Sequence, residues 1–363
     1  MPMTRSETSN ASYSCLEVCA GAGGQAIGLE AAGLDHVALI EIDPNACVTL
    51  RHNRPDWQVI EQDLTTVDFN DFKNQNVDLL SGGVPCPPFS VAGKQLGSDD
   101  ERDLFPILMK ATSTLLPRAI MIENVKGLLS QKFLPYREAI LDYLNDLGYI
   151  AEWRLFNAAE FGVPQTRYRS ILIAMRPEDW RNFSWPVGNQ SDPVTVGETL
   201  VGFMELNGWQ GAQDWAANAS KVGPTLVGGS KKHGGADLGP TRAKAAWREL
   251  GVDGMGLANE SPAPDFAGMP KLTVQMAAAI QGFPSSWQIQ GKKTAAYRQV
   301  GNAFPPPVAE ALGRSITEAF EATDKNVLLE QPTQPREQVI SLNARQLSIL
   351  SPESVELRLR ASS

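Results

Sequence analysis

The sequence has few cysteines, and their positions argue against a disulfide framework. Four cysteines occur among 363 residues, and all lie in the first quarter of the chain: Cys15, Cys19, Cys47 and Cys86. A disulfide-stabilised protein of this size would not concentrate its cysteines in this way. Cys15 and Cys19 are close together, but no matching second pair accompanies them, so a zinc site is not expected. We expect reduced thiols and no metal.

Long apolar runs are also missing. No run approaches the roughly 20 residues that span a bilayer, and we expect no membrane partner. Residues 1–14 are polar and lack the apolar stretch of a secretory signal. We interpret them as a disordered leader and expect a cytoplasmic protein. The chain is 42% hydrophobic and 20% charged, as in ordinary globular proteins, and its length accommodates an α/β domain with a second module.

Positive charge is in deficit, with 32 Lys and Arg against 41 Asp and Glu. The net charge of −9 argues against a protein that coats nucleic acid without specificity, because phosphate binding depends on Lys and Arg. One stretch is an exception. Residues 221–248 hold six basic residues and a single acidic one, Asp237, and are therefore a candidate DNA-reading segment.

Short apolar runs alternate with helix-like stretches in the first half of the chain. The expected buried strands are 16–19, 37–42, 77–80, 119–122 and 170–174. The expected helices are 25–32, 44–53, 104–116 and 136–147. This alternation predicts an α/β fold with a doubly wound, mostly parallel, Rossmann-like sheet.

The composition and the periodicity of the sequence change after Pro186. From there to about Pro270 the sequence is rich in Gly, contains Trp and has no clear periodicity. Helix signals return at 272–281 and 308–320. We expect a catalytic and cofactor-binding domain at 15–185, a smaller irregular domain at 186–290, a return to the first domain at 291–323, and a C-terminal tail at 324–363.

A glycine-rich turn follows the first expected strand. Because glycine has no side chain, the backbone of this turn can approach a nucleotide closely at Gly21, Gly23 and Gly24. Glu41 follows at the end of the second strand, before Ile42, where ribose hydroxyls would lie. The alternative is a tight turn without a ligand, with Glu41 as the cap of the next helix.

A third acidic residue, Asp63, is placed to accept from an adenine amino group while Leu64 packs on the ring. Together with the glycine turn and Glu41, it indicates an adenosine ligand. These residues alone do not separate a nicotinamide cofactor from S-adenosylmethionine, because both fit the same fold.

The expected strand 77–80 leads into a turn that carries one thiol, Cys86, next to Pro85. Doubly wound sheets place their chemistry at this carboxyl edge. The flanking prolines stiffen the backbone, and the turn offers no helix or strand face in which a structural cysteine would be buried. We therefore predict that Cys86 is a nucleophile.

The expected strand 119–122 delivers Glu123 to the same edge. In an apolar, enclosed site this carboxyl group would donate a proton to a ring bound beside Cys86. A surface or capping carboxylate is the alternative. The loop 90–97, with Lys94 as a phosphate contact, is a candidate lid, and a plain surface loop is its alternative.

Five motifs together resemble the DNA cytosine-5 methyltransferase family of bacterial restriction-modification type. In chain order they are Gly21 to Gly24, the pair Pro85-Cys86, Glu123-Asn124-Val125, Gln165 to Arg169 and Gln299 to Ala303. The resemblance spans roughly residues 16–322, interrupted by a variable stretch. It implies transfer of a methyl group from S-adenosylmethionine to carbon 5 of a flipped cytosine, with S-adenosylhomocysteine as the product.

The resemblance also implies roles for individual residues. Cys86 would attack the cytosine, Glu123 would protonate N3, and Arg167 and Arg169 would contact the flipped base and a nearby phosphate. The cofactor would be held by Gly21, Gly23, Gly24, Glu41, Ile42, Asp63, Leu64, Pro85 and Asn302. The family often has Asp and Phe where this chain has Glu17 and Cys19, so an aromatic contact to adenine is missing here.

The stretch from about Pro186 to Pro270 corresponds to the variable target-recognition region of this family. Phosphate contacts and base reading in the major groove are expected from polar and basic residues. The expected contacts to double-stranded DNA are Ser90, Lys94, Gln165, Thr225, Lys231, Lys232, Arg242 and Lys244.

Three other functions remain as alternatives. A related tRNA cytosine-5 methyltransferase would show a Cys-Phe-Thr signature, which is absent. A dehydrogenase would leave Cys86 and Glu123 without a role. A catalytically dead DNA-binding regulator would not need both of these residues intact. We expect a monomer that protects host DNA.

Overall fold

A computed structural model of the chain describes residues 12–84, 103–189, 191, 193–228 and 236–329. Within them, seven strands form one sheet in the order β3-β2-β1-β4-β5-β7-β6. The strands are β1 (Tyr13–Val18), β2 (Leu34–Glu41), β3 (Val59–Glu61), β4 (Leu79–Gly83), β5 (Ala119–Val125), β6 (Ile150–Asn157) and β7 (Tyr168–Met175). The first five strands are parallel, whereas β7 runs antiparallel to both β5 and β6. The predicted α/β, mostly parallel sheet is confirmed.

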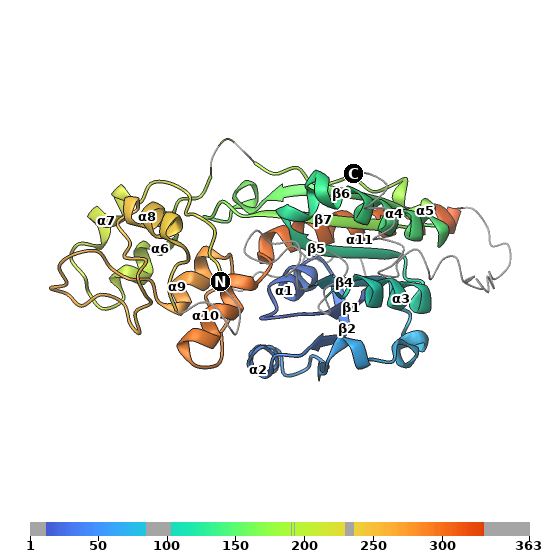
Figure 1. The fold of residues 1–363 in the computed structure, drawn as a ribbon, viewed down its shortest axis with the longest axis horizontal. Coiled ribbons are helices and arrows are strands. Elements are labelled where there is room, and N and C mark those ends of the chain that lie inside the picture. The colour runs from blue at the N-terminus through green and yellow to red at the C-terminus, as the bar shows by residue number, and fades with distance from the viewer. Residues whose placement is uncertain (1–11, 85–102, 190, 192, 229–235, 330–363) are drawn as a thin grey trace.

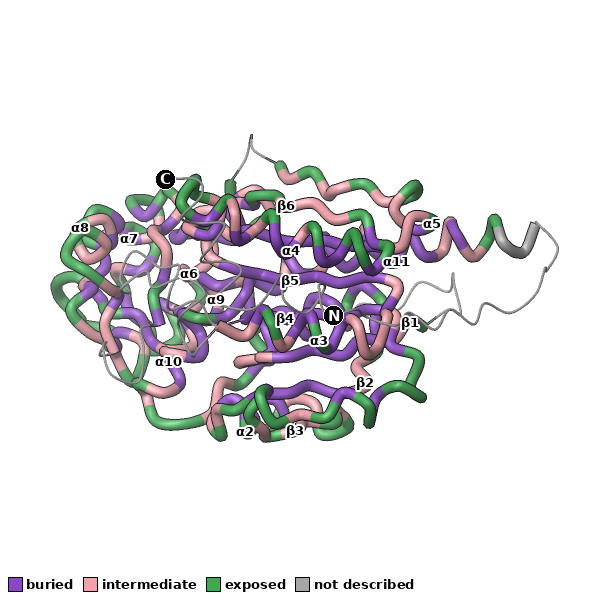
Figure 2. The backbone as a smooth tube through the Cα atoms, turned by 45° about the vertical axis from the view of Figure 1, so that its right-hand side comes forward, coloured by how far each residue is buried: buried purple, intermediate pink, exposed green. Residues whose placement is uncertain are grey.

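The sequence did not predict two of these strands. β3 has three residues, too few for an apolar run, and β6 at the sheet edge is largely exposed or half-buried. Central strands bury both faces and therefore read as continuous apolar runs. β4 and β5 follow this rule, because almost every residue in them is buried (Figure 2).

Helices cover both faces of the sheet. α3 (Phe105–Leu115) and α4 (Leu134–Asp146) contribute Leu108 and Ile140 to the core on one face. α1 (Gly24–Ala31) and α11 (Pro306–Leu329) contribute Leu29 and Leu312 to the core on the other. α1 and α11 approach closely, because a Cβ on Gly28 would lie 2.4 Å from the carbonyl oxygen of Pro306. The last helix therefore packs on the first domain.

Two more helices and several 3₁₀ turns are described in this part of the chain. They are α2 (Pro44–Asn53), α5 (Pro177–Trp180) and the 3₁₀ turns η1 (Leu64–Thr66), η2 (Phe69–Gln75), η4 (Lys126–Leu129), η5 (Gln131–Phe133) and η6 (Ala158–Phe161). No helix among the described residues is long and apolar enough to cross a membrane.

A second group of helices lies beside the sheet, at the left of Figure 1. It consists of α6 (Val196–Glu205), α7 (Ala212–Asn218), α8 (Thr241–Glu249), α9 (Val274–Ile280) and α10 (Lys293–Asn302). Val196, Leu200 and Trp247 are buried in its core. The prediction of irregular sequence is therefore wrong over α6, α7 and α8. A capping box between Thr195 and Glu198 marks the start of α6 and was a signal in the sequence.

Candidate active site

The glycine turn after β1 leaves an open space at one glycine and is packed at the next two. Gly21 and Gly23 have φ angles of 55° and 84°, which side chains rarely adopt. A Cβ on Gly23 would lie 2.7 Å from Leu50, and one on Gly24 would lie 2.2 Å from the carbonyl oxygen of Phe304. A Cβ on Gly21 would meet nothing within 4 Å. Gly21 is therefore the point at which a ligand can approach the backbone.

Glu41 holds this turn against the end of β2. One carboxylate oxygen accepts from the Gly21 N–H at 2.7 Å, and the other accepts from the N–H groups of Ile42 and Asp43 at 2.8 and 2.7 Å. Burial raises the pKa of Glu41, and these backbone hydrogen bonds oppose the rise. Asp43, rather than Glu41, caps α2, by accepting from the Asn45 N–H. The capping role considered for Glu41 is thus taken by its neighbour.

Ile42 and Asp63 give this edge an exposed apolar and an exposed acidic group. The Ile42 side chain is 60% exposed. Asp63 caps η1, and the N–H and hydroxyl of Thr65 donate to the same carboxylate oxygen and lower the pKa of Asp63. Leu64 is buried in the core beneath the sheet edge. The packing of Leu64 on the adenine ring therefore stays a prediction, whereas the exposed apolar side chain directly after β2 is Ile42.

Asn302, at the end of α10, comes next to the glycine turn from the far end of the chain. It is exposed, and a Cβ on Gly24 would lie 3.3 Å from the Cβ of Ala303. A backbone hydrogen bond from Gln62 to the Glu41 carbonyl joins the Asp63 segment to β2. The open space at Gly21, the exposed Ile42 and the ionised Asp63 suit an apolar ring with hydroxyl and amino groups, so these residues fit an adenosine cofactor.

Glu123 lies beside the end of β4, the strand that leads to Cys86. It pairs in register with Gly83, and a Cβ on Gly83 would lie 3.1 Å from a Glu123 carboxylate oxygen. Arg169 of β7 forms an ion pair with Glu123, with 2.5 Å between Nε and the carboxylate oxygen. Both side chains are largely buried. The ion pair holds the carboxyl group beside Gly83, three residues before Cys86 in the sequence.

The prediction that Arg167 faces the cleft is wrong. Arg167 is fully buried, and its guanidinium donates to the carbonyl oxygens of Leu226, Gly301 and Ala303 at 2.9 to 3.0 Å. Burial lowers the pKa of Arg167 well below its usual value. β7 begins only at Tyr168, so the strand alternation expected to put both arginines on one face does not extend to this residue.

Gln165 is also misassigned as a DNA contact. It is fully buried, donates to the side-chain oxygen of Gln281 at 2.7 Å, and accepts from the Leu226 N–H at 2.8 Å. A buried amide with these partners is part of the protein interior and does not reach DNA.

The other expected DNA contacts fall into three groups. Arg242 is exposed in the first turn of α8. Lys244 is half-buried and pairs with Asp237 at 2.8 Å, and the Thr225 hydroxyl donates to the Thr166 carbonyl at 2.6 Å. Ser90, Lys94, Lys231 and Lys232 lie outside the described residues, as do the predicted cofactor contact Pro85 and the predicted nucleophile Cys86.

Trp287 contributes to the site and was missed. Its indole N–H donates to the Ala22 carbonyl at 3.0 Å, and its ring lies against Gly23. The loop between α9 and α10 thus supports the glycine turn directly. No spacing signal could have revealed this contact, because it joins a side chain to backbone more than two hundred residues away.

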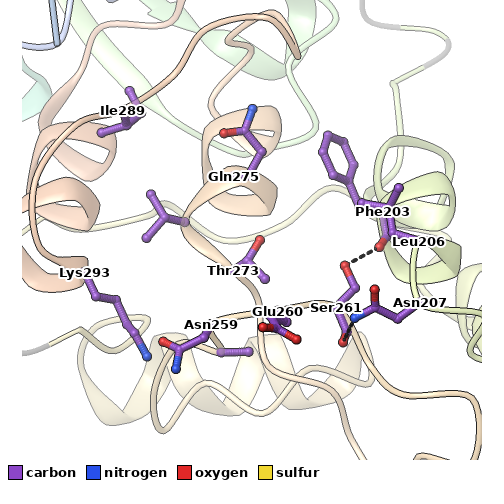
Figure 3. Close-up of a pocket in the computed structure, with 12 residues that line it drawn as sticks. Phe203, Leu206, Asn207, Asn259, Glu260, Ser261, Thr273, Gln275, Ile289 and Lys293 are labelled. Carbon is purple, nitrogen blue, oxygen red and sulfur yellow. Dashed lines mark hydrogen bonds between the residues drawn. The ribbon is translucent and has the colours of Figure 1, made fainter.

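A hollow of about 520 Å³ lies elsewhere, between α6, α9 and α10 (Figure 3). Its polar lining is used within the protein: Asn207 donates to the Ser261 carbonyl, and the Ser261 hydroxyl donates to the Phe203 carbonyl. This hollow shares no lining residue with the sheet edge described above. Among the described residues, no group of His, Cys, Asp and Glu is arranged to hold a metal ion.

Changing Gly24 to alanine tests the packing of the glycine turn. The new Cβ would collide with the Phe304 backbone, and overpacking of this kind typically costs about 1–3 kcal/mol. We expect Gly24→Ala to lower the free energy of unfolding in urea by that amount. The matched control is Gly202→Ala at an exposed position of α6, where a Cβ meets nothing within 4 Å and stability should rise by up to about 1 kcal/mol. Equal stability of the two variants would contradict the contact.

Comparison with known proteins gives a consistent picture. Residues 13–318 match the family model described as C-5 cytosine-specific DNA methylase. The chain is 54% identical over 313 residues to the Type II methyltransferase M.NaeI of Lentzea aerocolonigenes, covering 85% of this chain and 76% of that protein. It is 51% identical to the Type II methyltransferase M.NgoMIV of Neisseria gonorrhoeae, covering 85% and 98%.

The fold is also found among solved structures. The Entamoeba histolytica methyltransferase EhMeth superimposes with a TM-score of 0.61 at 16% sequence identity, covering 86% of this chain and 99% of that one. At this identity the likeness concerns the fold alone.

Proposed function

Since the chain belongs to the C-5 cytosine-specific DNA methylase family, we propose that it methylates carbon 5 of a cytosine within a specific double-stranded DNA sequence. Its place would be the modification half of a restriction-modification system. The observation that carries the proposal is the Glu123 carboxyl group, oriented by Arg169 beside the end of the strand that leads to Cys86. A dehydrogenase has no use for this pair.

The proposed chemistry starts from the low reactivity of the ring, because carbon 5 of cytosine is a poor nucleophile. The Cys86 thiolate adds to carbon 6 while Glu123 gives a proton to N3, which turns the ring into an enamine. The enamine carbon 5 takes the methyl group. A general base then removes the proton from carbon 5, and the bond between Cys86 and carbon 6 breaks. N3 returns its proton to Glu123, so the cysteine, the carboxyl group and the aromatic ring are all restored.

The target base must leave the duplex for this reaction, because carbon 6 is not accessible to a thiol inside stacked DNA. In the proposal, Arg169 contacts the extruded base, since its guanidinium already lies against Glu123. Arg242 and Lys244 of α8 contact the DNA, with Thr225, Ser90, Lys94, Lys231 and Lys232 as further candidates. We propose that residues 186–290 form the target-recognition domain and that one monomer suffices.

S-adenosylmethionine, when bound, supplies the methyl group and becomes S-adenosylhomocysteine. Gly21, Glu41 and Ile42 would hold its adenosine from one side, with Asp63 at the amino group and Asn302 across the turn. Gly23 and Gly24 shape the turn through their packing. Pro85 stays a predicted contact, and Leu64 would support the pocket from the core.

Replacing Asp63 tests the cofactor assignment. Losing one hydrogen bond to a charged group, worth about 1.5–3 kcal/mol, should weaken S-adenosylhomocysteine binding to Asp63→Ala by about ten-fold or more, measured by titration calorimetry. Asp68 is a matched control, because it also caps a 3₁₀ turn by accepting from an N–H two residues ahead and is also exposed. Similar losses in Asp63→Ala and Asp68→Ala would remove Asp63 from the cofactor site.

The proposed function as a whole is tested in a host that lacks DNA methylation. After expression of the protein, 5-methylcytosine is mapped across the genome by base-resolution sequencing. We expect one methylated sequence motif. Unmodified DNA, or methylated tRNA in its place, would overturn the proposal, and the second result would favour the tRNA methyltransferase alternative.

A further inference from the structure

The two domains are joined by a buried junction built from segments 164–167, 223–228, 280–281 and 301–303. Segments 164–167 and 223–228 run side by side. The Gly223 N–H donates to the Pro164 carbonyl at 2.9 Å, and the Thr166 N–H donates to the Gly223 carbonyl at 2.8 Å. The Thr225 hydroxyl adds a bond to the Thr166 carbonyl. The approach to β7 is thereby fixed to segment 223–228, which belongs to the helical domain, residues 186–290 and therefore without α10.

Two glycines let the helical domain touch the end of α10 without a side chain between them. A Cβ on Gly301 would lie 2.3 Å from the Gly228 nitrogen. A Cβ on Gly228 would lie 2.6 Å from the side-chain oxygen of Asn302. The backbone at Gly228 therefore lies directly against the residue proposed to hold the cofactor.

Arg167 connects these parts through three carbonyl oxygens. One guanidinium nitrogen donates to Leu226, two residues before Gly228, and the other donates to Gly301 and Ala303, the two neighbours of Asn302. Burying a cation against neutral carbonyls costs more than burying an apolar side chain of similar size. Packing alone therefore does not account for an arginine here, whereas fixing three backbone groups from two segments requires its planar set of donors.

The position of Arg167 in the sequence links the junction to the catalytic pair. Arg169, two residues later, holds Glu123. Gln165, two residues earlier, bonds to Gln281 and to the Leu226 N–H, and Gln281 in turn donates to the Ala303 carbonyl. The same short segment thus touches the catalytic carboxyl group, both neighbours of Asn302 and the helical domain.

We propose that Arg167 is a positioning residue that couples cofactor binding to DNA binding, by fixing the end of α10 and the helical domain to the same guanidinium. The proposal rests on the proposed function, because it takes Asn302 as a cofactor residue and α8 as a DNA contact. A cofactor that fixes Asn302 would then favour one placement of the helical domain, and DNA held by that domain would favour the cofactor-binding placement of Asn302. Such coupling is necessarily reciprocal.

The coupling is measured by linkage. The dissociation constant of a duplex that carries the sequence identified by methylome mapping is determined with and without saturating S-adenosylhomocysteine. In the unmodified protein we expect S-adenosylhomocysteine to tighten DNA binding by about five-fold or more. In Arg167→Met the ratio should fall toward one. Binding of S-adenosylhomocysteine with and without duplex gives the reciprocal ratio and should change equally.

Arg176→Met is the matched control. Arg176 directly follows the opposite end of β7, donates to the Leu147 carbonyl at 2.9 Å, and stacks over Tyr149. The Arg176→Met variant also loses an arginine that is bonded to backbone. Because Arg176 does not touch the junction, the coupling in this variant should keep its unmodified value. A general loss of stability would lower the folded fraction of a variant, and because S-adenosylhomocysteine stabilises the folded state it would raise the apparent coupling rather than abolish it.

Thr225→Val provides a second variant in case Arg167→Met folds poorly. It keeps the shape of the side chain and removes one hydrogen bond of the junction, so the ratio should fall partway. The proposal is overturned if the unmodified protein shows no coupling, or if Arg167→Met and Thr225→Val keep the unmodified ratio. Either result would leave the proposed function standing, provided that the unmodified protein methylates the same duplex.

Discussion

Replacing Cys86 by serine is expected to slow methyl transfer by about 10⁴-fold or more, the scale seen when a covalent nucleophile is removed. A serine hydroxyl is far less acidic than a thiol, so it supplies almost no anion to attack carbon 6 at neutral pH. The measurement is single-turnover transfer of a labelled methyl group to the duplex. Binding of S-adenosylhomocysteine should change little, because the sulfur acts on the base.

Cys15→Ser is the matched control for this prediction. Cys15 is fully buried in β1, with its sulfur 3.2 Å from the Ser81 hydroxyl, and burial raises the pKa of its thiol. A serine there retains a hydrogen-bonding group, so transfer should proceed at close to the unmodified rate. If Cys86→Ser transferred methyl groups as fast as Cys15→Ser, the covalent mechanism would be wrong.

Changing Glu123 to glutamine should slow methyl transfer by about 10²–10⁴-fold, the usual contribution of a general acid. Glutamine has nearly the shape of glutamate, but it cannot give a proton to N3 and it breaks the ion pair with Arg169. The rate of the chemical step should fall much more than the affinity for S-adenosylhomocysteine, since Glu123 lies beside Gly83 rather than at the glycine turn.

Glu152→Gln separates this effect from the general loss of a carboxylate bound to arginine. Glu152 lies on edge strand β6. It pairs with Arg154 at 2.8 Å and accepts a hydrogen bond from the Trp185 indole. Its replacement should leave the rate of methyl transfer unchanged. A Glu123→Gln variant that is no slower than Glu152→Gln would exclude Glu123 as the proton donor.

The sheet could be predicted from the sequence where its strands are buried on both faces. β1, β4 and β5 are buried along almost their whole length, and the residues that follow their apolar side chains mark the carboxyl edge without any knowledge of the fold. β3 and β6 lie at the two edges of the sheet, where half-exposed residues give no such run. The helices α6, α7 and α8 escaped prediction because they are short and their packing, rather than their periodicity, stabilises them.

The candidate site was predictable for residues that reach it through their own strand ends, such as Glu41 and Glu123. Residues that act through backbone from distant segments were not predictable. Arg167 illustrates the limit, because its position one residue before β7 turns its side chain toward Leu226 and Gly301 instead of the base. Strand alternation holds only within the strand, and the sequence alone does not show where β7 begins.

The central claim, that Cys86 forms a covalent bond to the target cytosine, is tested most directly by trapping on a duplex in which that cytosine is 5-fluorocytosine. After methyl transfer, fluorine at carbon 5 cannot be removed as a proton, so the adduct persists. With S-adenosylmethionine present, mass spectrometry of digested complex should find the base attached to the peptide that contains Cys86, and Cys86→Ser should give no adduct. An absent adduct, or one that survives in Cys86→Ser, would contradict the claim.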